Sequence, residues 1–385
     1  MKRLLAFFKW FFISSVGFIL LLYIFDVDYL LRAVKTVYFK GYTTAFLEDY
    51  KEFPNRTIQK GTAQPWAVSK AYNSVPATEK LNSIHKNFQT VAFLIIKNDS
   101  IWHESYFDGY TNTSKSNSFS MAKSIVSAAL GKAIMQGKIK SLDQKVTDFF
   151  PKLKGKFAKE VTVGDLSSMA SGLSWDEKYY SPFSIVTRAY FDDQLKEVIL
   201  GLSIIDKPGQ KFNYLSGATQ LLAMCIEKAT GMYLSNYVSE HFWKPMGAEN
   251  DALWQLDAAD FGIEKAYCCI ASNARDFARF GKLYKQNGVW NGKQILERTF
   301  VEKSLQPRFS DSPEYGYGWW LHQINGKKVF YMWGHLGQFV IVIPEEELII
   351  VRLGHATGKQ LQNDPHSNDL YVYVEEALKM CNQKK

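Results

Sequence analysis

The sequence predicts an α+β fold in which strands from both ends of the chain form one antiparallel β-sheet with flanking helices, and a mainly helical lobe is inserted between them. Short apolar runs bounded by turn residues, a pattern typical of strands, occur at 91–107 and again after Pro313. The part between them, about 141–309, has apolar residues at helical spacing, interrupted by Gly and Pro. With 385 residues, 46% of them hydrophobic, the chain is long enough to bury a large core.

The first 25 residues predict an N-terminal transmembrane anchor. Lys2 and Arg3 precede an almost entirely apolar run, in which Lys9 is the one further charge. This run reaches the roughly 20 residues that a helix needs to cross a bilayer core. No small-residue cleavage site follows Phe25, which favours an uncleaved anchor over a cleaved signal peptide.

The charges on either side of this segment predict its orientation. Basic residues precede it and Asp26 and Asp28 follow it, so the positive-inside rule places the N-terminus in the cytoplasm. We therefore expect the rest of the chain on the periplasmic or extracytoplasmic side of an inner (cytoplasmic) membrane. Residues 26–76, which contain three spaced prolines, are expected to form a juxtamembrane linker and lead-in to a folded domain at 77–385.

The individual elements follow from periodicity and from turn residues. The expected strands are 91–96, 101–107, 315–323, 327–333, 338–343 and 348–353. The expected helices are 163–170, 183–202, 216–230, 234–242 and 274–287, with a final amphipathic helix at 369–381. A cleft between the sheet and the helical lobe is the expected place for a site.

Charge and cysteine content narrow the function classes. The formal charge of +8 is spread over single lysines, which indicates a solvated surface; attraction to an anionic membrane or cell-wall polymer is the alternative. No basic and aromatic cluster suggests a nucleic-acid partner. The cysteines form no C-x-x-C pattern and no disulfide framework. We expect the adjacent Cys268 and Cys269 to pack in a core, although an exported protein can pair some of its cysteines.

The helix expected to begin near Ser120 carries the first candidate for chemistry. Ser120 and Lys123 are three residues apart, so their side chains share a helix face. Neighbouring residues are apolar on most sides, which predicts a buried helix and a buried Lys123. Burial disfavours the ammonium form, so the amine can act as a base near neutral pH and activate the serine hydroxyl. The backbone N–H groups of the helix N-terminus suit a developing oxyanion.

The Ser-x-x-Lys pattern alone is weak evidence, because the chain contains it twice. The other copy, Ser83 to Lys86, lies in a stretch that predicts an ordinary amphipathic helix with a solvated face. Two later stretches support the Ser120 copy. Tyr214-Leu-Ser216 places a phenol and a hydroxyl just before a helix, where the phenol can relay a proton. His335-Leu-Gly337 opens a strand whose edge can pair with a substrate amide.

Together these motifs resemble the serine β-lactamase and penicillin-binding-protein superfamily, most closely its class C-like branch of 6-aminohexanoate-oligomer hydrolases and related esterases. The resemblance covers roughly residues 55–379, and the motifs Ser-x-x-Lys, Tyr-x-Ser and His-x-Gly occur in the family's order. Supporting stretches are Leu166-Ser-Ser-Met-Ala-Ser-Gly172, Leu173-Ser-Trp-Asp-Glu177 with Tyr179, Ala274-Arg-Asp-Phe-Ala-Arg-Phe-Gly281 and Tyr315-Gly-Tyr-Gly-Trp-Trp320.

By position, the resemblance implies that Ser120 is the acylated nucleophile, Lys123 its base and Tyr214 the proton relay. It places the oxyanion between the backbone N–H groups of Ser120 and Gln338. It also implies contacts to the substrate from Tyr179, Ser216, His335 and Gly337. Tyr179 matches a position at which some amide hydrolases of this branch hold the leaving amide.

The chain departs from the family pattern where a penicillin carboxylate usually docks. His335 replaces the lysine of Lys-Thr-Gly and Leu336 replaces the threonine, so a fixed cation and a hydroxyl are missing. The other interpretation of His335 is a structural histidine. Trp175 and Trp320 either line the cleft or are ordinary buried aromatic side chains.

The resemblance therefore implies a membrane-anchored serine hydrolase that cleaves small amides or esters, without a metal or an organic cofactor. A cell-wall peptide is a further candidate substrate. One alternative is a D-Ala-D-Ala carboxypeptidase or β-lactamase-like enzyme, which the missing cation disfavours. Another is a non-catalytic binding or scaffold protein, which a misaligned Lys123 would favour. The sequence does not indicate an oligomeric state.

Overall fold

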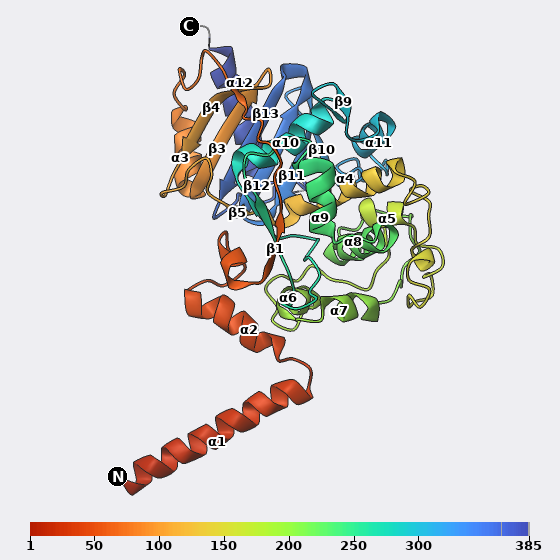
Figure 1. Cartoon of the computed structure of the whole chain (residues 1–385). Coiled ribbons are helices and arrows are strands. Elements are labelled where there is room, and N and C mark those ends of the chain that lie inside the picture. Colours follow the sequence, from red (N-terminus) through yellow and green to blue (C-terminus); the bar gives the residue numbers. More distant parts are fainter. Residues whose placement is uncertain (363, 384–385) are drawn as a thin grey trace.

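The computed structural model describes residues 1–362 and 364–383. Figure 1 shows a sheet at one end of the folded body, a helical lobe beside it, and a long N-terminal helix that extends away from both. The helices are α1 (Lys2–Ile24), α2 (Tyr29–Thr36), α3 (Glu79–Asn87), α4 (Ala122–Met135), α5 (Val163–Ser167), α6 (Ile185–Phe191), α7 (Leu195–Gly201), α8 (Ser216–Thr230), α9 (Leu234–Val238), α10 (Ala274–Lys285), α11 (Arg298–Ser304) and α12 (Asn368–Asn382).

The strands form two sheets and a small hairpin. A seven-stranded sheet has the order β10-β11-β12-β13-β3-β4-β2, a four-stranded sheet the order β1-β6-β7-β5, and β8 pairs with β9. The strand bounds are β1 (Asn55–Ile58), β2 (Ala67–Val68), β3 (Thr90–Lys97), β4 (Ser100–Tyr106), β5 (Ser116–Asn117), β6 (Ala252–Gln255), β7 (Ile270–Ser272), β8 (Val289–Trp290), β9 (Lys293–Gln294), β10 (Trp320–Ile324), β11 (Lys327–Gly334), β12 (Gln338–Ile343) and β13 (Leu348–Gly354).

The prediction that both ends of the chain share one sheet is confirmed. β13 from the C-terminal part pairs antiparallel with β3 from the N-terminal part, with Ile350 opposite Ile95. All neighbouring strands of this sheet are antiparallel except β2, which runs parallel to β4. The α+β class therefore follows from the pairing of strands that lie some 250 residues apart in the sequence.

Alternation along the central strands divides the core into two layers. Phe93 and Ile95 face a cluster that includes Tyr373 of α12, whereas Leu94 and Ile96 face the cluster shared with the helical lobe. Period-2 alternation puts successive side chains on opposite faces of a sheet, so a strand buried on both faces is apolar throughout. β3 shows this pattern, because its residues from Thr90 to Ile96 are all buried.

Three details differ from the sequence-based expectation. Residues 26–76, expected to be a linker and lead-in, contribute α2, β1 and β2 to the folded body. The part expected to be helical, about 141–309, also supplies β6 and β7 to a second sheet. The helix expected at 183–202 is two helices, because α6 ends before Asp192, whose backbone is extended.

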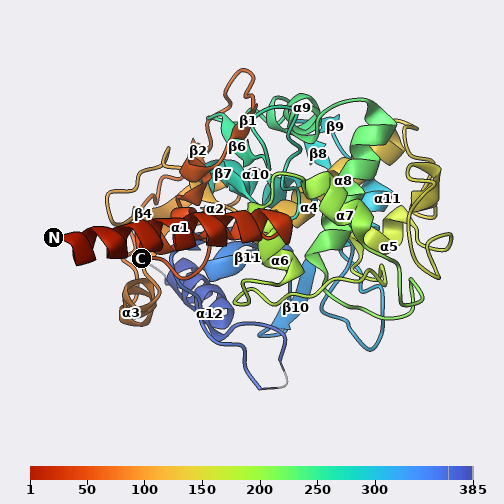
Figure 2. The ribbon, with the colours of Figure 1, turned by 90° about the horizontal axis from the view of Figure 1, so that it is seen from below.

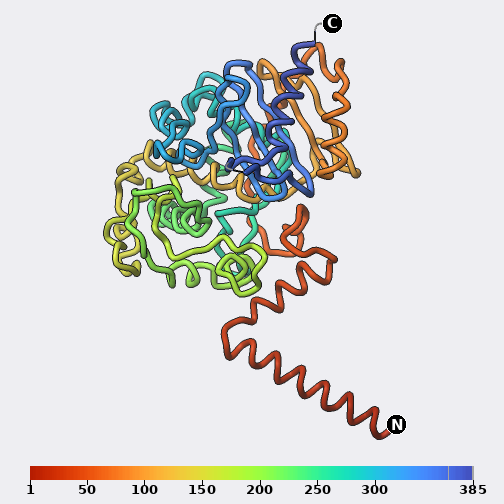
Figure 3. The backbone as a smooth tube through the Cα atoms, turned by 180° about the vertical axis from the view of Figure 1, so that it is seen from behind, coloured from red at the N-terminus to blue at the C-terminus, as the bar shows by residue number. Residues whose placement is uncertain are grey.

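α1 is long and apolar enough to cross a membrane, and no other helix of the described residues meets the same test. None of its 23 residues is buried in the protein. Viewed from behind, the chain runs from the body through α2 into α1, which leads away from both sheet and lobe (Figure 3). A signal sequence would have the same length and composition, so the helix alone does not decide between anchor and signal.

Helix α10 lies so close to the large sheet that a glycine is needed at the contact. A Cβ atom added to Gly281 would lie 3.0 Å from side-chain atoms of Val340 and Val342 and 3.3 Å from Ile349. We expect Gly281→Val to lower the free energy of unfolding by about 1–3 kcal/mol, because the larger side chain overpacks this layer. Thermal unfolding of the detergent-solubilised full chain would measure the change.

Gly201 provides the matched control, since it also lies in a helix but an added Cβ meets no atom within 4 Å. Gly201→Val is expected to leave the unfolding midpoint nearly unchanged. Equal midpoints for the two variants would contradict the close approach of α10 to the sheet.

Candidate active site

Ser120 and Lys123 face each other at the start of α4. Ser120 lies in a short 3₁₀ turn, Phe119–Met121, and Lys123 lies in the first turn of the α-helix that follows. Lys123 Nζ is 2.7 Å from Ser120 Oγ and donates a hydrogen bond of 2.8 Å to the carbonyl oxygen of Tyr267. The second Ser-x-x-Lys pair has no such arrangement, because Ser83 and Lys86 are exposed on α3.

The turn that presents Ser120 is held from several sides. Phe119 has a φ of +44°, a left-handed conformation that costs a non-glycine residue of order 1–3 kcal/mol and persists where the surroundings enforce it. The N–H of Ser118 donates to Ile270 O at 2.7 Å, and the N–H of Phe119 donates to Asn117 Oδ1 at 2.9 Å. A Cβ added to Gly334 would lie 2.2 Å from Ser118 O, so β11 approaches this turn at backbone distance.

The lysine amine is buried, as predicted. Lys123 is 3% exposed, and burial lowers its pKa to about 8, while the negative charge of Glu177 opposes this shift. A fraction of the molecules can then carry a neutral amine near neutral pH, and more do at higher pH. A neutral amine can donate one N–H hydrogen bond to Tyr267 O and direct its lone pair at the Ser120 hydroxyl.

Tyr214 packs beside this pair as a neutral phenol. Lys123 Nζ lies 5.1 Å from the centroid of the Tyr214 ring. Burial raises the pKa of Tyr214 above its ordinary value, the Ser120 hydroxyl lowers it and Glu177 raises it. Because the net direction is upward, Tyr214 carries its proton at neutral pH. The environment of Tyr214 therefore favours the phenol over a tyrosinate.

Glu177 is a site residue whose role the sequence did not reveal. Its carboxylate accepts hydrogen bonds from Trp175 Nε1 at 2.8 Å, from the Tyr179 hydroxyl, and from both the N–H and the hydroxyl of Ser216, the latter at 3.1 Å. Ser216 is the first residue of α8, so the carboxylate caps the positive end of this helix. The one available signal was its place between Trp175 and Tyr179, in a stretch that resembles the family.

Four of the expected site residues line one cavity of about 370 Å³: Ser120, Tyr179, Ser216 and His335. The Tyr179 ring stacks on His335, with centroids 5.9 Å apart and planes 14° apart. Burial lowers the pKa of His335 to about 4, and no hydrogen-bond partner contacts its buried Nε2 within the described part of the chain. His335 is therefore an uncharged, aromatic wall of the cavity at neutral pH.

Gly337 and Gln338 form a rigid turn next to this cavity and do not line it. The buried Arg352 donates to Leu336 O at 2.8 Å and to Gly337 O at 2.9 Å, and Leu336 has a φ of +61°. The Gln338 side chain donates to His335 O at 3.0 Å and to Gly354 O at 2.7 Å. These bonds fix the backbone of Gln338, whose N–H is the predicted partner of Ser120 N–H in the oxyanion hole.

Groups suited to metal binding do not gather near Ser120. Within residues 1–362 and 364–383, no cluster of three or more His, Cys, Asp or Glu side chains is placed to hold a metal ion. Cys268 and Cys269, which the sequence left unassigned beyond a core position, are buried and form a disulfide between adjacent residues. Cys225 and Cys381 are free.

Comparison with known proteins places the chain in a family. The "Beta-lactamase" family model matches residues 56–372. The chain belongs to the β-lactamase family. Membership of this family supports a serine hydrolase of the group that acts on amides or esters.

Individual relatives agree with this assignment. The chain is 26% identical over 226 residues to a 6-aminohexanoate-dimer hydrolase of Paenarthrobacter ureafaciens, a match that covers 56% of this chain and only 57% of that enzyme. A Bacillus anthracis structure classed provisionally as a 6-aminohexanoate-dimer hydrolase has a TM-score of 0.70 at 23% identity, covering 86% of this chain and 91% of the other. A D-amino acid amidase from Ochrobactrum anthropi has a TM-score of 0.56 at 15% identity, covering 78% and 94%. These two structures share the β-lactamase fold.

The electrostatics predict the pH dependence of serine reactivity. Since the pKa of Lys123 is lowered to about 8, labelling of Ser120 by a fluorophosphonate should accelerate as pH rises through this value. Glu177 favours the charged amine, so Glu177→Gln should move the rise to lower pH. Labelling rates between pH 6 and 10 on the full chain, followed by intact mass, would measure both effects.

Glu302→Gln is the control for a lost negative charge, because among the described residues Glu302 pairs with Arg298 alone, on the exposed face of α11. It should leave the profile unchanged. A shift of the Glu177→Gln profile to higher pH would contradict the charge coupling between Glu177 and Lys123.

Proposed function

We propose that the chain is a membrane-anchored serine hydrolase that works through an acyl-enzyme on Ser120. The observation that carries the proposal is the 2.7 Å approach of Lys123 Nζ to Ser120 Oγ in a buried site that lowers the pKa of the amine to about 8. Such a pair supplies what a serine lacks at its own pKa, a neighbouring base poised near the working pH.

In the proposed reaction, Lys123 takes the proton of Ser120 as Oγ bonds to the substrate carbonyl carbon. The backbone N–H groups of Ser120 and Gln338 hold the oxyanion. The protonated Tyr214 donates to the leaving group as its bond to the carbonyl breaks, and it recovers a proton from Lys123. A water molecule then hydrolyses the Ser120 ester along the same path and restores the serine hydroxyl.

The site disfavours a D-Ala-D-Ala carboxypeptidase or a β-lactamase. Both act on substrates with a carboxylate close to the scissile amide, and a lysine ordinarily faces that carboxylate in this superfamily. Here His335 takes the place of that lysine, and its lowered pKa leaves it uncharged at neutral pH. The scaffold alternative needs a misaligned Lys123, whereas the amine contacts the serine hydroxyl.

The proposed location is an inner (cytoplasmic) membrane, with α1 as the anchor and the catalytic body on the periplasmic or extracytoplasmic side. The apolar α1 has no buried residue, and basic residues are confined to its N-terminal half. The end of α1 is tied to the body, because Asp26 forms an ion pair with Arg188 of α6.

Covalent labelling tests the catalytic assignment. We expect one fluorophosphonate adduct on the full chain by intact mass, complete loss of the adduct in Ser120→Ala, and a labelling rate at least ~100-fold lower in Lys123→Ala because the nucleophile loses its base. Tyr214→Phe should still be labelled, but its turnover of short amide substrates should fall at least ~10-fold, since the amine leaving group loses its proton donor.

The second Ser-x-x-Lys pair provides the matched control. Ser83→Ala and Lys86→Ala should keep the adduct and the labelling rate of the wild type, because both residues are exposed on α3. A folded wild-type protein that forms no adduct would overturn the hydrolase mechanism in favour of a binding protein.

A further inference from the structure

The cavity that contains Ser120 extends to the membrane helix. Its wall includes Phe18 and Leu22 of α1, Leu30 and Val34 of α2, and the segment 179–187 that follows Glu177. In Figure 2 α1 lies in front of α2 and its C-terminal end is near α6, and residues of all three helices line the cavity. The candidate nucleophile therefore shares one continuous groove with the part of the chain that is built to enter a bilayer.

This groove is held in place by specific contacts. The Tyr29 hydroxyl donates to Pro182 O at 3.2 Å, and Arg32 Nη1 donates to Asp257 O at 2.9 Å. Asp26, between α1 and α2, forms an ion pair with Arg188, which also bonds to Asp192 at 3.0 Å. Because the first half of α2 is tied to the catalytic body, the apolar face of this helix is held against the groove.

The wall of the groove is uncharged. Among the described residues that line it, none is an Asp, Glu, Lys or Arg, and its one histidine, His335, has a pKa lowered to about 4. A charged group placed there would lose its hydration without gaining a partner, at a large cost in free energy. The groove thus favours an apolar chain and disfavours a carboxylate or an ammonium group.

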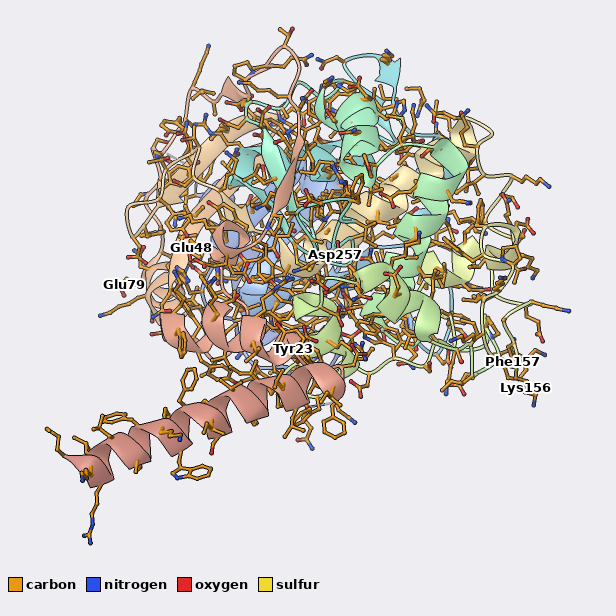
Figure 4. The ribbon with its side chains drawn as sticks, turned by 60° about the horizontal axis from the view of Figure 1, so that its bottom comes forward. Tyr23, Glu48, Glu79, Lys156, Phe157 and Asp257 are labelled. Carbon is orange, nitrogen blue, oxygen red and sulfur yellow. A yellow bond between two sulfur atoms is a disulfide. The ribbon has the colours of Figure 1, made fainter. Side chains whose placement is uncertain are left out.

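The groove wall also includes exposed aromatic side chains. Tyr180 is 77% exposed, Phe183 72% and Tyr38 58%, and all three also line the groove. Tyr and Trp side chains are enriched where a protein meets the membrane surface, and exposed phenylalanines add apolar area there. α1 is about 35 Å long at 1.5 Å per residue, enough for a bilayer core of about 30 Å. Figure 4 shows its first turns projecting into open space while its last turns, near Tyr23, reach the body.

We propose that the substrate is a single-chain amphiphile, a long-chain acyl ester or amide, that passes from the bilayer into this groove with its acyl chain against α1 and α2. The inference rests on the proposed function of Ser120. Ser120 Oγ bonds to the acyl carbon, the bond to the head-group oxygen or nitrogen breaks, and the head group leaves with a proton. Water then hydrolyses the acyl-serine and releases a fatty acid.

Chain length gives the test, with the full-length protein in neutral detergent micelles. We expect kcat/KM for p-nitrophenyl decanoate to exceed that for p-nitrophenyl acetate by at least ~100-fold, because each buried methylene adds favourable transfer free energy. A ten-carbon p-nitrophenyl ester whose chain ends in a carboxylate should lose most of this gain, since the wall offers no cation.

Val34→Trp narrows the groove from α2 and should lower kcat/KM for decanoate at least ~5-fold more than kcat/KM for acetate. Val68→Trp is the matched control, because Val68 is exposed on β2 outside the groove and both rates should stay unchanged. Fluorophosphonate labelling of Ser120 in each variant verifies that the site is folded.

The outcomes separate this inference from the proposed function. Hydrolysis of acetate with no gain for decanoate, or an equal loss for both esters in Val34→Trp, would overturn the lipid substrate and leave the serine hydrolase intact. Failure of both esters together with failure of Ser120 labelling in a folded wild type would overturn the two proposals at once.

Discussion

The site depends on one constraint: the amine of Lys123 must be able to lose its charge while it keeps its position beside Ser120. Lys123 meets it through burial and through two partners, Ser120 Oγ and Tyr267 O. The carbonyl of Tyr267 adds to the effect of burial, because it accepts a hydrogen bond from the amine and so directs the lone pair. An amine buried without that acceptor would pay for desolvation and lie at no defined angle to the serine.

One short segment, residues 267–270, contacts both Lys123 and the turn that presents Ser120. Residues 267–270 supply the carbonyl that orients Lys123, and Ile270 exchanges hydrogen bonds with Ser118, on the turn that presents Ser120. The disulfide between Cys268 and Cys269 lies between these two contacts, and Cys269 has a φ of +77°. Base and nucleophile are therefore positioned from a common piece of backbone, which lies 144 residues from Lys123 in the sequence.

Sequence reasoning found the elements that have a clear periodicity or residue spacing, and it missed short strands and single side-chain contacts between distant segments. The large sheet, the start of α8 at Ser216 and the Ser120–Lys123 pair follow from periodicity, turn residues and three-residue spacing. The four-stranded sheet could not be predicted in this way, since its strands are two to four residues long and come from four separate regions. The role of Glu177 could not be predicted either, because its partner Ser216 lies 39 residues later and no spacing rule connects the two residues.

His335 stands where the family pattern has a lysine, and the effect of this difference depends on the other residues of the groove. The missing lysine would have little effect if another segment placed a lysine or an arginine in the cavity wall. The described lining residues, drawn from α1, α2, the 179–191 segment and the catalytic turns, include none. The whole cavity wall therefore lacks a cation among the described residues. The same wall includes the apolar face of α2 and exposed aromatic side chains. Electrostatics and shape thus select the same neutral, elongated ligand, by two independent physical effects.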